Sequence, residues 1–252
     1  MRDEGASFLL AIQFLTRVPV GSDRLYTPKR LAASVRYYPL VGVLIGCVSA
    51  AMFLASSLVV PQTVAILLAI ATGLLVTGAF HEDGLADTFD GVGGGLTREK
   101  ALEIMKDSRL GTYGTLALVT ALALKASAFV AMSPSLIPAA LVAGHGLSRV
   151  SSILVIATSR YVRDEGTGKP VAGGLSPISL VVALLTGGVI IAGWTVLQTP
   201  FALALALGGL LLGHLLMRLF FEPKLGGYTG DTLGAVQQAS EVGFYLGLLI
   251  WL

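Results

Sequence analysis

The chain has 252 residues, of which 54% are hydrophobic and 13% are charged. Ordinary globular proteins carry about 25% charged residues, so this composition argues against a water-soluble domain and indicates one integral membrane domain over residues 1–252. The net charge of +2 gives no support to a protein that binds nucleic acid by neutralising phosphates. The single cysteine, Cys47, excludes an internal disulfide framework and an all-cysteine metal site.

The N-terminal segment, residues 7–16, is a short apolar stretch that ends at Arg17. No small-residue cleavage pattern follows it, so it is not predicted to be a signal peptide. Phe8, Ile12 and Leu15 share one face of a helix, which predicts a helix that lies in the membrane interface.

Seven windows have the roughly 20 mostly apolar residues that are needed to cross a bilayer. They are residues 38–60, 63–80, 112–132, 139–158, 178–197, 201–221 and 232–252. The last window is polar in its first half and is the weakest candidate. Short uncharged turns join the first window to the second, the third to the fourth and the fifth to the sixth, which predicts three helical hairpins. The expected fold class is an all-α polytopic bundle with about 6–7 membrane-spanning helices.

Lys and Arg residues gather on one side of this arrangement. They precede the first window, follow the second, fourth and sixth, and are missing from the short turns. The positive-inside rule makes this side cytoplasmic. We therefore expect a multi-pass protein of the cell membrane whose N-terminus and polar loops face the cytoplasm.

Four carboxylates lie within nine residues at the end of the second window: Glu82, Asp83, Asp87 and Asp90. If that helix continues past Phe80, the three aspartates follow an i, i+4, i+7 spacing and project from one face. Converging carboxylate oxygens suit Mg²⁺, which fills its other positions with water and substrate phosphates. Zinc fits poorly, because His81 is the only nearby nitrogen ligand. The alternative is a solvated cap of the span, although such a cap usually mixes Lys with Glu.

A cluster of glycines follows the carboxylates directly. Glycine adopts backbone conformations that are closed to other residues, and such a run can turn several N–H groups toward an anion. We therefore expect Gly93, Gly94 and Gly95 to contact a substrate phosphate. An ordinary glycine-containing loop is the alternative.

Residues 97–110 predict a short amphipathic helix with Thr97 as its N-cap. Lys106 and Arg109 are three residues apart, so on a helix both would face one ligand, and the Arg guanidinium offers a planar fork to phosphate oxygens. Both are assigned to catalysis at phosphate. Anchoring of the next span to the cytoplasmic side is the alternative.

Residues 223–234 form a second polar, glycine-rich motif on the same predicted side. We interpret it as a flexible loop that closes over a substrate. Lys224 would contact phosphate, Tyr228 would belong to the substrate site, and Asp231 would bind a ligand or accept a proton. The alternative is an ordinary turn in which Asp231 caps the last helix.

Three charged or titratable residues lie inside the windows. Lys125, His145 and Arg149 are costly in lipid and are expected to face a polar interior. His145 and Arg149 share one helical face, so both could line a cavity above the carboxylates, and Arg149 is a candidate for substrate binding. A transporter also places charges within spans, but here the dense charge lies at one membrane surface.

The residues alone favour a membrane transferase that acts on a phosphate or diphosphate substrate with Mg²⁺. Phosphoryl transfer needs cations on the nonbridging oxygens and an in-line nucleophile. The acidic motif would bind the metal ion, and the basic residues would supply the other positive charges. Other metal-dependent membrane transferases, such as the CDP-alcohol phosphotransferases and the prenyltransferases, also gather aspartates at a membrane surface. Their acidic motifs have a different spacing.

The sequence resembles the adenosylcobinamide-GDP ribazoletransferase, or cobalamin synthase, family along nearly the whole chain. The resemblance is carried by residues 14–20, 38–42, 81–95, 105–114 and 226–234. It implies a polytopic membrane enzyme that uses Mg²⁺ and joins adenosylcobinamide-GDP to α-ribazole or its 5′-phosphate. A ribose hydroxyl attacks the cobinamide-linked phosphorus in that reaction, and the products are adenosylcobalamin or its 5′-phosphate and GMP. The family's acidic motif maps onto Glu82, Asp83, Asp87 and Asp90.

This resemblance implies the two substrates as partners, while the composition and net charge indicate the lipid bilayer and no nucleic acid. The sequence leaves the oligomeric state open, a homo-oligomer included.

Overall fold

The computed structural model describes residues 2–21, 24–163, 175–197 and 200–251. Within these ranges the chain is helical, with one isolated bridge between Tyr161 and Tyr228 and no strand. The helices are α1 (Arg2–Leu15), α2 (Pro28–Ser34), the 3-10 turn η2 (Val35–Tyr37), α3 (Tyr38–Ser56), α4 (Gln62–Thr77), α5 (Phe80–Gly94), α6 (Arg98–Ile104), α7 (Thr112–Ala131), α8 (Ile137–Thr158), α9 (Pro177–Leu197), α10 (Pro200–Leu225) and α11 (Gly230–Leu249). The all-α fold class is confirmed.

Five stretches of helix among the described residues are long and apolar enough to cross a membrane. They are Pro28–Ser56, which ends with α3, and the helices α7, α8, α9 and α10. α4 and α5 pass the same test together as a bent pair, which makes a sixth candidate. α11 has 20 residues but is not among them, because polar residues fill its first half. The described chain thus has up to six apolar candidates, and the weakest of the seven windows is not one of them.

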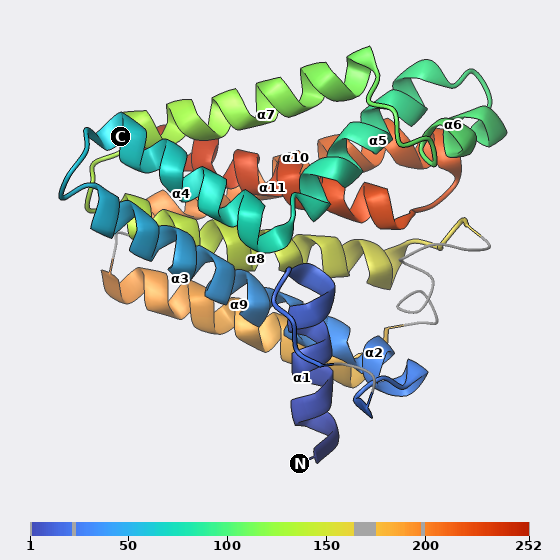
Figure 1. Ribbon diagram of the computed structural model, residues 1–252, viewed down its shortest axis with the longest axis horizontal. Helices are drawn as coiled ribbons and strands as arrows, with labels where there is room; N and C mark the ends of the chain where they lie inside the picture. Colours follow the sequence, from blue (N-terminus) through green and yellow to red (C-terminus); the bar gives the residue numbers. More distant parts are fainter. Residues whose placement is uncertain (1, 22–23, 164–174, 198–199, 252) are drawn as a thin grey trace.

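α11 lies inside the bundle rather than against lipid (Figure 1). It packs against α10, α5, α8 and α7, and its polar side chains at Gln237, Gln238 and Glu241 are buried among them. The contact with α10 is backbone to backbone, because a Cβ at Gly209 would overlap the carbonyl oxygen of Gly243. Small residues permit such close approach of helices in membranes.

The three expected hairpins differ in outcome. α3 and α4 pack together, which confirms the first. α7 packs chiefly on α5 and α11, whereas α8 packs on α3 and α11, so the second pair does not form a packed hairpin. α9 packs mainly on α8 and α10 on α11, which makes the third hairpin a minor contact. A short turn brings two helix ends together, but the matching of side chains decides which helices pack.

The helix of the second window ends at Thr77, so the condition that it continues past Phe80 is not met. Gly78 ends α4 in the left-handed conformation, with φ of 67°, and Ala79 follows with φ of 56°. The axes of α4 and α5 then differ by 86°. A left-handed glycine after the last turn is a common helix stop, since it has no Cβ to clash. Because of this bend, α5 and its acidic residues run almost perpendicular to the axis of α4.

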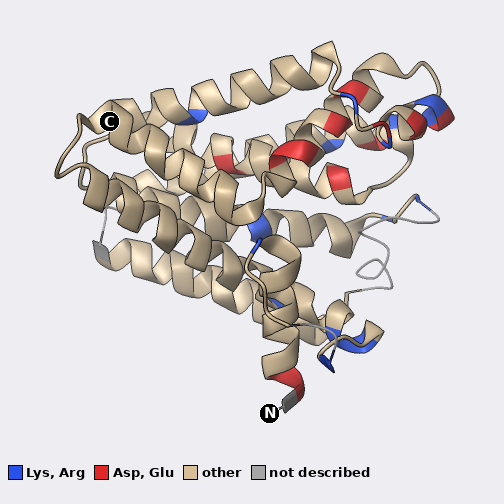
Figure 2. Ribbon diagram, viewed as in Figure 1, with Lys and Arg blue, Asp and Glu red and all other residues tan. Residues whose placement is uncertain are grey.

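Among the described residues, most charged positions lie toward one end of the bundle, and few lie at the opposite end (Figure 2). This agrees with the predicted one-sided distribution of charge. α1 runs across the direction of the spanning helices (Figure 1) and packs on α2 and α3 through buried Ala6, Leu10 and Leu15. Asp3 and Arg30 add an ion pair of 2.7 Å between α1 and α2. The orientation of α1 is that expected of an interfacial helix.

Candidate active site

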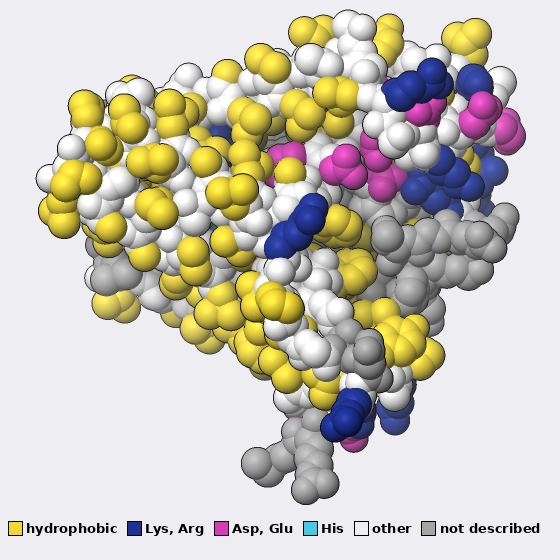
Figure 3. All heavy atoms as spheres, in the orientation of Figure 1, with side chains coloured by type: hydrophobic (Ala, Val, Ile, Leu, Met, Phe, Trp, Pro, Cys, Tyr) yellow, Lys and Arg dark blue, Asp and Glu magenta, His cyan; other side chains and the backbone are white. Residues whose placement is uncertain are grey.

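A polar cleft of about 780 Å³ opens beside α5. Three acidic side chains of α5 line it: Glu82, Asp83 and Asp87. Asp83 is exposed, whereas Glu82 and Asp87 are half-buried. We call this feature the acidic cleft. Figure 3 shows acidic side chains gathered on this face of the molecule, with basic side chains on either side of them.

Basic residues line other parts of the acidic cleft. Lys106 comes from the segment after α6, and Arg17 comes from the segment after α1. The backbone N–H of Arg17 donates to the carbonyl of Val76 at 2.8 Å, and its side chain covers the bend at Gly78. By sequence, Arg17 counts only among the positive charges that precede the first window. The bend between α4 and α5 is what brings it to the cleft.

The start of α11 approaches α5 at its acidic end. A Cβ at Gly84 would lie 2.7 Å from the backbone oxygen of Asp231, so only glycine allows this contact. The approach places Asp231 close enough to Asp87 for mutual repulsion, and Asp83 repels Asp87 as well. Three carboxylates from two helices therefore share one region of negative charge.

Asp231 does not cap α11, which was the alternative interpretation of this residue. Thr229 is the N-cap, and it forms a reciprocal capping box with Thr232. Asp231 instead pairs with Arg163 at 2.8 Å. Burial raises the pKa of Asp231, and the guanidinium of Arg163 opposes that rise.

Asp90 has a different environment from the other aspartates. Its carboxylate accepts hydrogen bonds from the backbone N–H groups of Gly111 at 2.7 Å and Gly114 at 2.8 Å. These N–H groups at the start of α7 have no acceptor within that helix, so Asp90 satisfies them and fixes α7 to α5. The spacing put Asp90 with Asp83 and Asp87, but Asp90 is not among the residues that line the cleft.

The residues at the cleft fit a magnesium ion in part. Within the described ranges no three His, Cys, Asp or Glu side chains converge closely enough to hold a metal by themselves. Mg²⁺ usually takes only one or two protein carboxylates and completes its octahedron with water and substrate phosphates. Asp83 and Asp87 can supply these two carboxylates. Oε2 of Glu82 is shielded from solvent and has no hydrogen-bond donor among the described residues. A cation would relieve both the repulsion and this unpaired oxygen.

The expected helix over residues 97–110 is shorter than predicted. Thr97 caps α6 as expected, but the helix ends at Ile104. Lys106 and Arg109 therefore do not share a helical face. The side chain of Arg109 is 87% exposed and binds Asp107, whose pKa that hydrogen bond lowers to about 2. Arg109 is not among the residues that line the cleft.

The glycine cluster does not form an anion-binding loop, contrary to expectation. Gly93 and Gly94 lie in the last turn of α5, and the N–H of Gly95 donates to Gly91 within the same helix. A Cβ at Gly95 would lie 2.5 Å from the backbone nitrogen of Ala101. The glycines allow α5 and α6 to pack closely. The N–H groups of these glycines are used in hydrogen bonds within α5 and are not free for an anion.

The second glycine motif is anchored rather than free to close over the cleft. α10 extends through Lys224, and Tyr228 exchanges backbone hydrogen bonds with Arg160 and Val162 at 2.8 and 3.0 Å. The ring of Tyr228 is buried against Tyr161, and burial raises the pKa of Tyr228 to about 12. Tyr228 is thus part of the core, and Lys224 lines a separate hollow together with Arg163.

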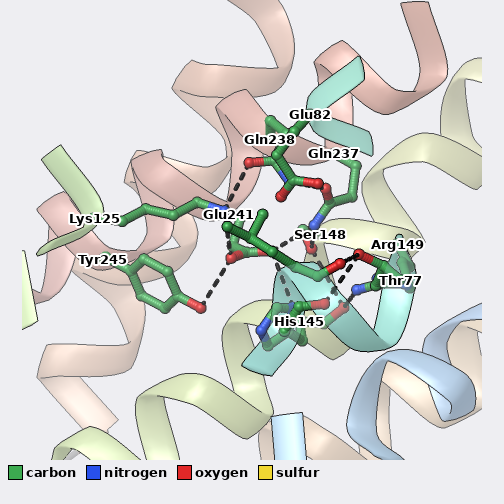
Figure 4. A network of polar contacts seen from close by, with 12 residues as sticks. Thr77, Glu82, Lys125, His145, Ser148, Arg149, Gln237, Gln238, Glu241 and Tyr245 are labelled. Carbon is green, nitrogen blue, oxygen red and sulfur yellow. Dashed lines mark hydrogen bonds and ion pairs between the residues drawn. The ribbon is translucent and has the colours of Figure 1, made fainter. Parts of the chain in front are cut away.

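A network of buried polar side chains extends from the cleft into the bundle (Figure 4). Its centre is Glu241 of α11, which lies 2.8 Å from Nζ of Lys125 and 3.2 Å from Nδ1 of His145. Tyr245 also donates to Glu241. The prediction that Lys125 and His145 face a polar interior is confirmed. Arg149, the third of these residues, is buried and donates to the carbonyl of His145 at 2.7 Å.

The network reaches the acidic segment through Gln238. This amide accepts from Lys125 at 2.7 Å and donates to Oε1 of Glu82 at 2.8 Å. Arg149 shares with Glu82 and Lys125 a cavity of about 20 Å³, which has room for about one water molecule. Arg149 is therefore placed at this small cavity and not among the residues that line the acidic cleft.

Comparison with known proteins gives a family. The model of the cobalamin-5-phosphate synthase family matches residues 7–249. A protein of Shewanella frigidimarina named adenosylcobinamide-GDP ribazoletransferase is 47% identical over 247 residues, which are 96% of this chain and 93% of that protein. A protein of the same name from Leptothrix cholodnii is 44% identical and covers 98% and 97% of the two chains.

The chain belongs to the cobalamin-5-phosphate synthase family. It is therefore a transferase of late cobalamin biosynthesis, as the sequence resemblance implied. A transporter and the other two families of membrane transferase are set aside. No solved structure matches the chain.

For a transferase of this family, sequence reasoning missed two groups of residues that the structure brings to the site. Gln237, Gln238 and Glu241 made the last window look like a poor span, which was the signal that this helix is shielded from lipid. Arg163 looked like one more positive charge on the cytoplasmic side. Only the approach of residues 160–163 to the start of α11 reveals its ion pair with Asp231.

Proposed function

We propose that the chain transfers the cobinamide phosphate group of adenosylcobinamide-GDP to α-ribazole or α-ribazole 5′-phosphate and releases GMP. The observation that carries this proposal is the acidic cleft, where Asp83 and Asp87 share one surface with Arg17 and Lys106. Opposite charges of this kind are what a diphosphate and its metal require. The names of the relatives supply the substrate class.

We assign roles to the cleft residues by their chemistry. Asp83 and Asp87 would hold Mg²⁺, which would offset the charge on the diphosphate and on the departing GMP. Arg17 and Lys106 would contact nonbridging phosphate oxygens. A ribose hydroxyl forms the new bond to phosphorus and the bond from phosphorus to GMP breaks. Asp231 would orient the hydroxyl and accept the proton that it gives up.

The charged end of the bundle is proposed to face the cytoplasm. We expect a Lys100→Cys variant, made in a Cys47→Ser background, to react with an impermeant maleimide only in inside-out vesicles. A Ser133→Cys variant, whose residue lies in the turn between α7 and α8, should react only in right-side-out vesicles. The reverse pattern would place the acidic cleft on the outer face.

The function is tested by GMP release from adenosylcobinamide-GDP with each acceptor, with and without Mg²⁺. We expect Mg²⁺-dependent release by the wild type and a loss of about 10²-fold or more in Asp83→Asn, because one electrostatic contact of this kind contributes that much to catalysis. Glu99→Gln, which removes an exposed carboxylate of α6, is the matched control and should behave like the wild type. Release of CMP or pyrophosphate from the substrates of other transferases, with no GMP release here, would overturn the proposal.

A second test addresses the approach of α11 to α5. We expect Gly84→Ala to lower kcat by about 10²-fold, because its Cβ would push Asp231 away from Asp83 and Asp87 and a displacement of about 1 Å can cost that much. Gly188→Ala in α9 is the control, since a Cβ there meets no atom within 4 Å. Equal kcat in both variants would show that the position of Asp231 does not matter.

A further inference from the structure

A basic hollow of about 520 Å³, separate from the acidic cleft, is lined by Arg163, the ion-pair partner of Asp231. Its charged and hydroxyl side chains are Arg98, Arg160, Tyr161, Arg163 and Lys224. No Asp or Glu is among the described residues that line it. We call this feature the basic hollow. None of the roles proposed for the acidic cleft uses it.

Arg163 is the residue that points to a ligand. Its side chain is only 10% exposed, and Nη1 pairs with Asp231 at 2.8 Å. Nε and Nη2 are shielded from solvent, yet neither has an acceptor among the described residues. These two nitrogens form the side of the guanidinium that donates two parallel hydrogen bonds to one carboxylate or phosphate. A buried, charged fork without an acceptor is costly, so a bound anion would complete it.

A second unpaired donor lies close by. The hydroxyl of Tyr161 is also shielded and has no partner in the described part of the chain. Burial raises the pKa of Tyr161, so its hydroxyl keeps the proton and can donate it in a hydrogen bond. Arg163 and Tyr161 together offer three donors at one place, which matches the several acceptor oxygens of a phosphate group.

The walls of the basic hollow are held in place before any ligand binds. Nε of Arg160 donates to the carbonyl of Gly226 at 2.7 Å, and Nε of Arg98 donates to that of Leu225 at 2.8 Å. Gly226 and Gly227 have φ of 73° and 157°, and a Cβ at Gly227 would overlap the carbonyl of Arg160. The two segments therefore form a preorganised cradle, which reduces the entropy lost on binding.

We infer that the basic hollow is the subsite that binds the 5′-phosphate of the acceptor α-ribazole 5′-phosphate. The inference rests on the proposed function. The donor's diphosphate belongs with the metal ligands Asp83 and Asp87, so a second phosphate needs a second basic site. Asp231 pairs with Arg163 of the basic hollow and repels Asp87 of the acidic cleft, so a ribose held by its 5′-phosphate against Arg163 would bring its hydroxyl near Asp231.

Kinetics with two acceptors tests the inference. Lys224→Ala and Tyr161→Phe do not disturb the ion pair with Asp231, and Arg163→Lys keeps the charge while it removes the fork. In each variant we expect KM for α-ribazole 5′-phosphate to rise about tenfold, which is the effect of one lost hydrogen bond to a charged group. KM for α-ribazole and kcat should stay the same in the Lys224 and Tyr161 variants. Lys29→Ala, which removes an exposed charge elsewhere, is the control.

Other outcomes have distinct meanings. A rise in KM for adenosylcobinamide-GDP with both acceptors would assign the basic hollow to the donor and overturn the inference. Unchanged constants in all three variants would overturn it as well. Calorimetric titration of α-ribazole 5′-phosphate and of α-ribazole into the full-length protein without donor gives a readout independent of turnover. If the wild type releases no GMP, the proposed function fails, whereas equal affinity of Lys224→Ala and wild type for the phosphorylated acceptor overturns the inference alone.

Discussion

Asp87→Asn is expected to lower kcat for GMP release by about 10²- to 10³-fold, because it removes a metal-binding carboxylate from the acidic cleft. The same change should raise the melting temperature of the protein in EDTA. Asp87 is repelled by Asp83 and Asp231, and a neutral amide removes that repulsion. Mg²⁺ should stabilise the wild type more than the variant, since the wild type gains more from the cation. Melting curves in detergent with and without Mg²⁺ measure both effects.

Asp90→Asn is the informative comparison. This variant keeps one acceptor oxygen and loses the other, so one N–H at the start of α7 is left without its partner. We expect a loss of about 1 kcal/mol in the free energy of unfolding, as for a lost helix cap. The rise in melting temperature with Mg²⁺ should remain as in the wild type. If Asp90→Asn abolished that rise and Asp87→Asn did not, the assignment of the two aspartates would be reversed.

This contrast shows where sequence reasoning ends. The i, i+4, i+7 spacing correctly places the three aspartates on one helix, because the period of a helix is a local property. Which of them lines the cleft depends on Gly111 and Gly114, where a Cβ would clash with the carboxylate of Asp90. Spacing carries no information about a helix that begins more than 20 residues later.

The spanning helices were predictable for a physical reason. A bilayer requires about 20 apolar residues in a row, and such windows are visible in any sequence. The bend at Gly78 and Ala79 was not predictable in this way, because an alanine in the left-handed conformation is held by its surroundings and not by its own preference. The glycine cluster after α5 was misread for a related reason. Close packing and anion binding both require glycine, and only the position of α6 distinguishes them.

The buried network around Glu241 gives the largest expected effect on stability. Glu241→Leu should lower the free energy of unfolding by about 3–5 kcal/mol, because it leaves the ammonium of Lys125 buried without a counter-charge. A lipid-facing control, Thr195→Leu in α9, should change stability little, since its hydroxyl bonds only within its own helix. Unfolding in mixed detergent micelles measures both. If Glu241→Leu had the same free energy of unfolding as the wild type, the ammonium of Lys125 would have to be paired with water or with another side chain.

The double variant Lys125→Met with Glu241→Leu separates charge pairing from simple packing. If the cost comes from one uncompensated charge, the double variant should be more stable than Glu241→Leu alone, since apolar pairs often replace buried ion pairs without loss. Its turnover should still be low. Lys125 also donates to Gln238, which in turn holds Oε1 of Glu82 at the edge of the acidic cleft. Restored stability without restored kcat would show that the network positions Glu82, whereas restoration of both would confine its role to folding.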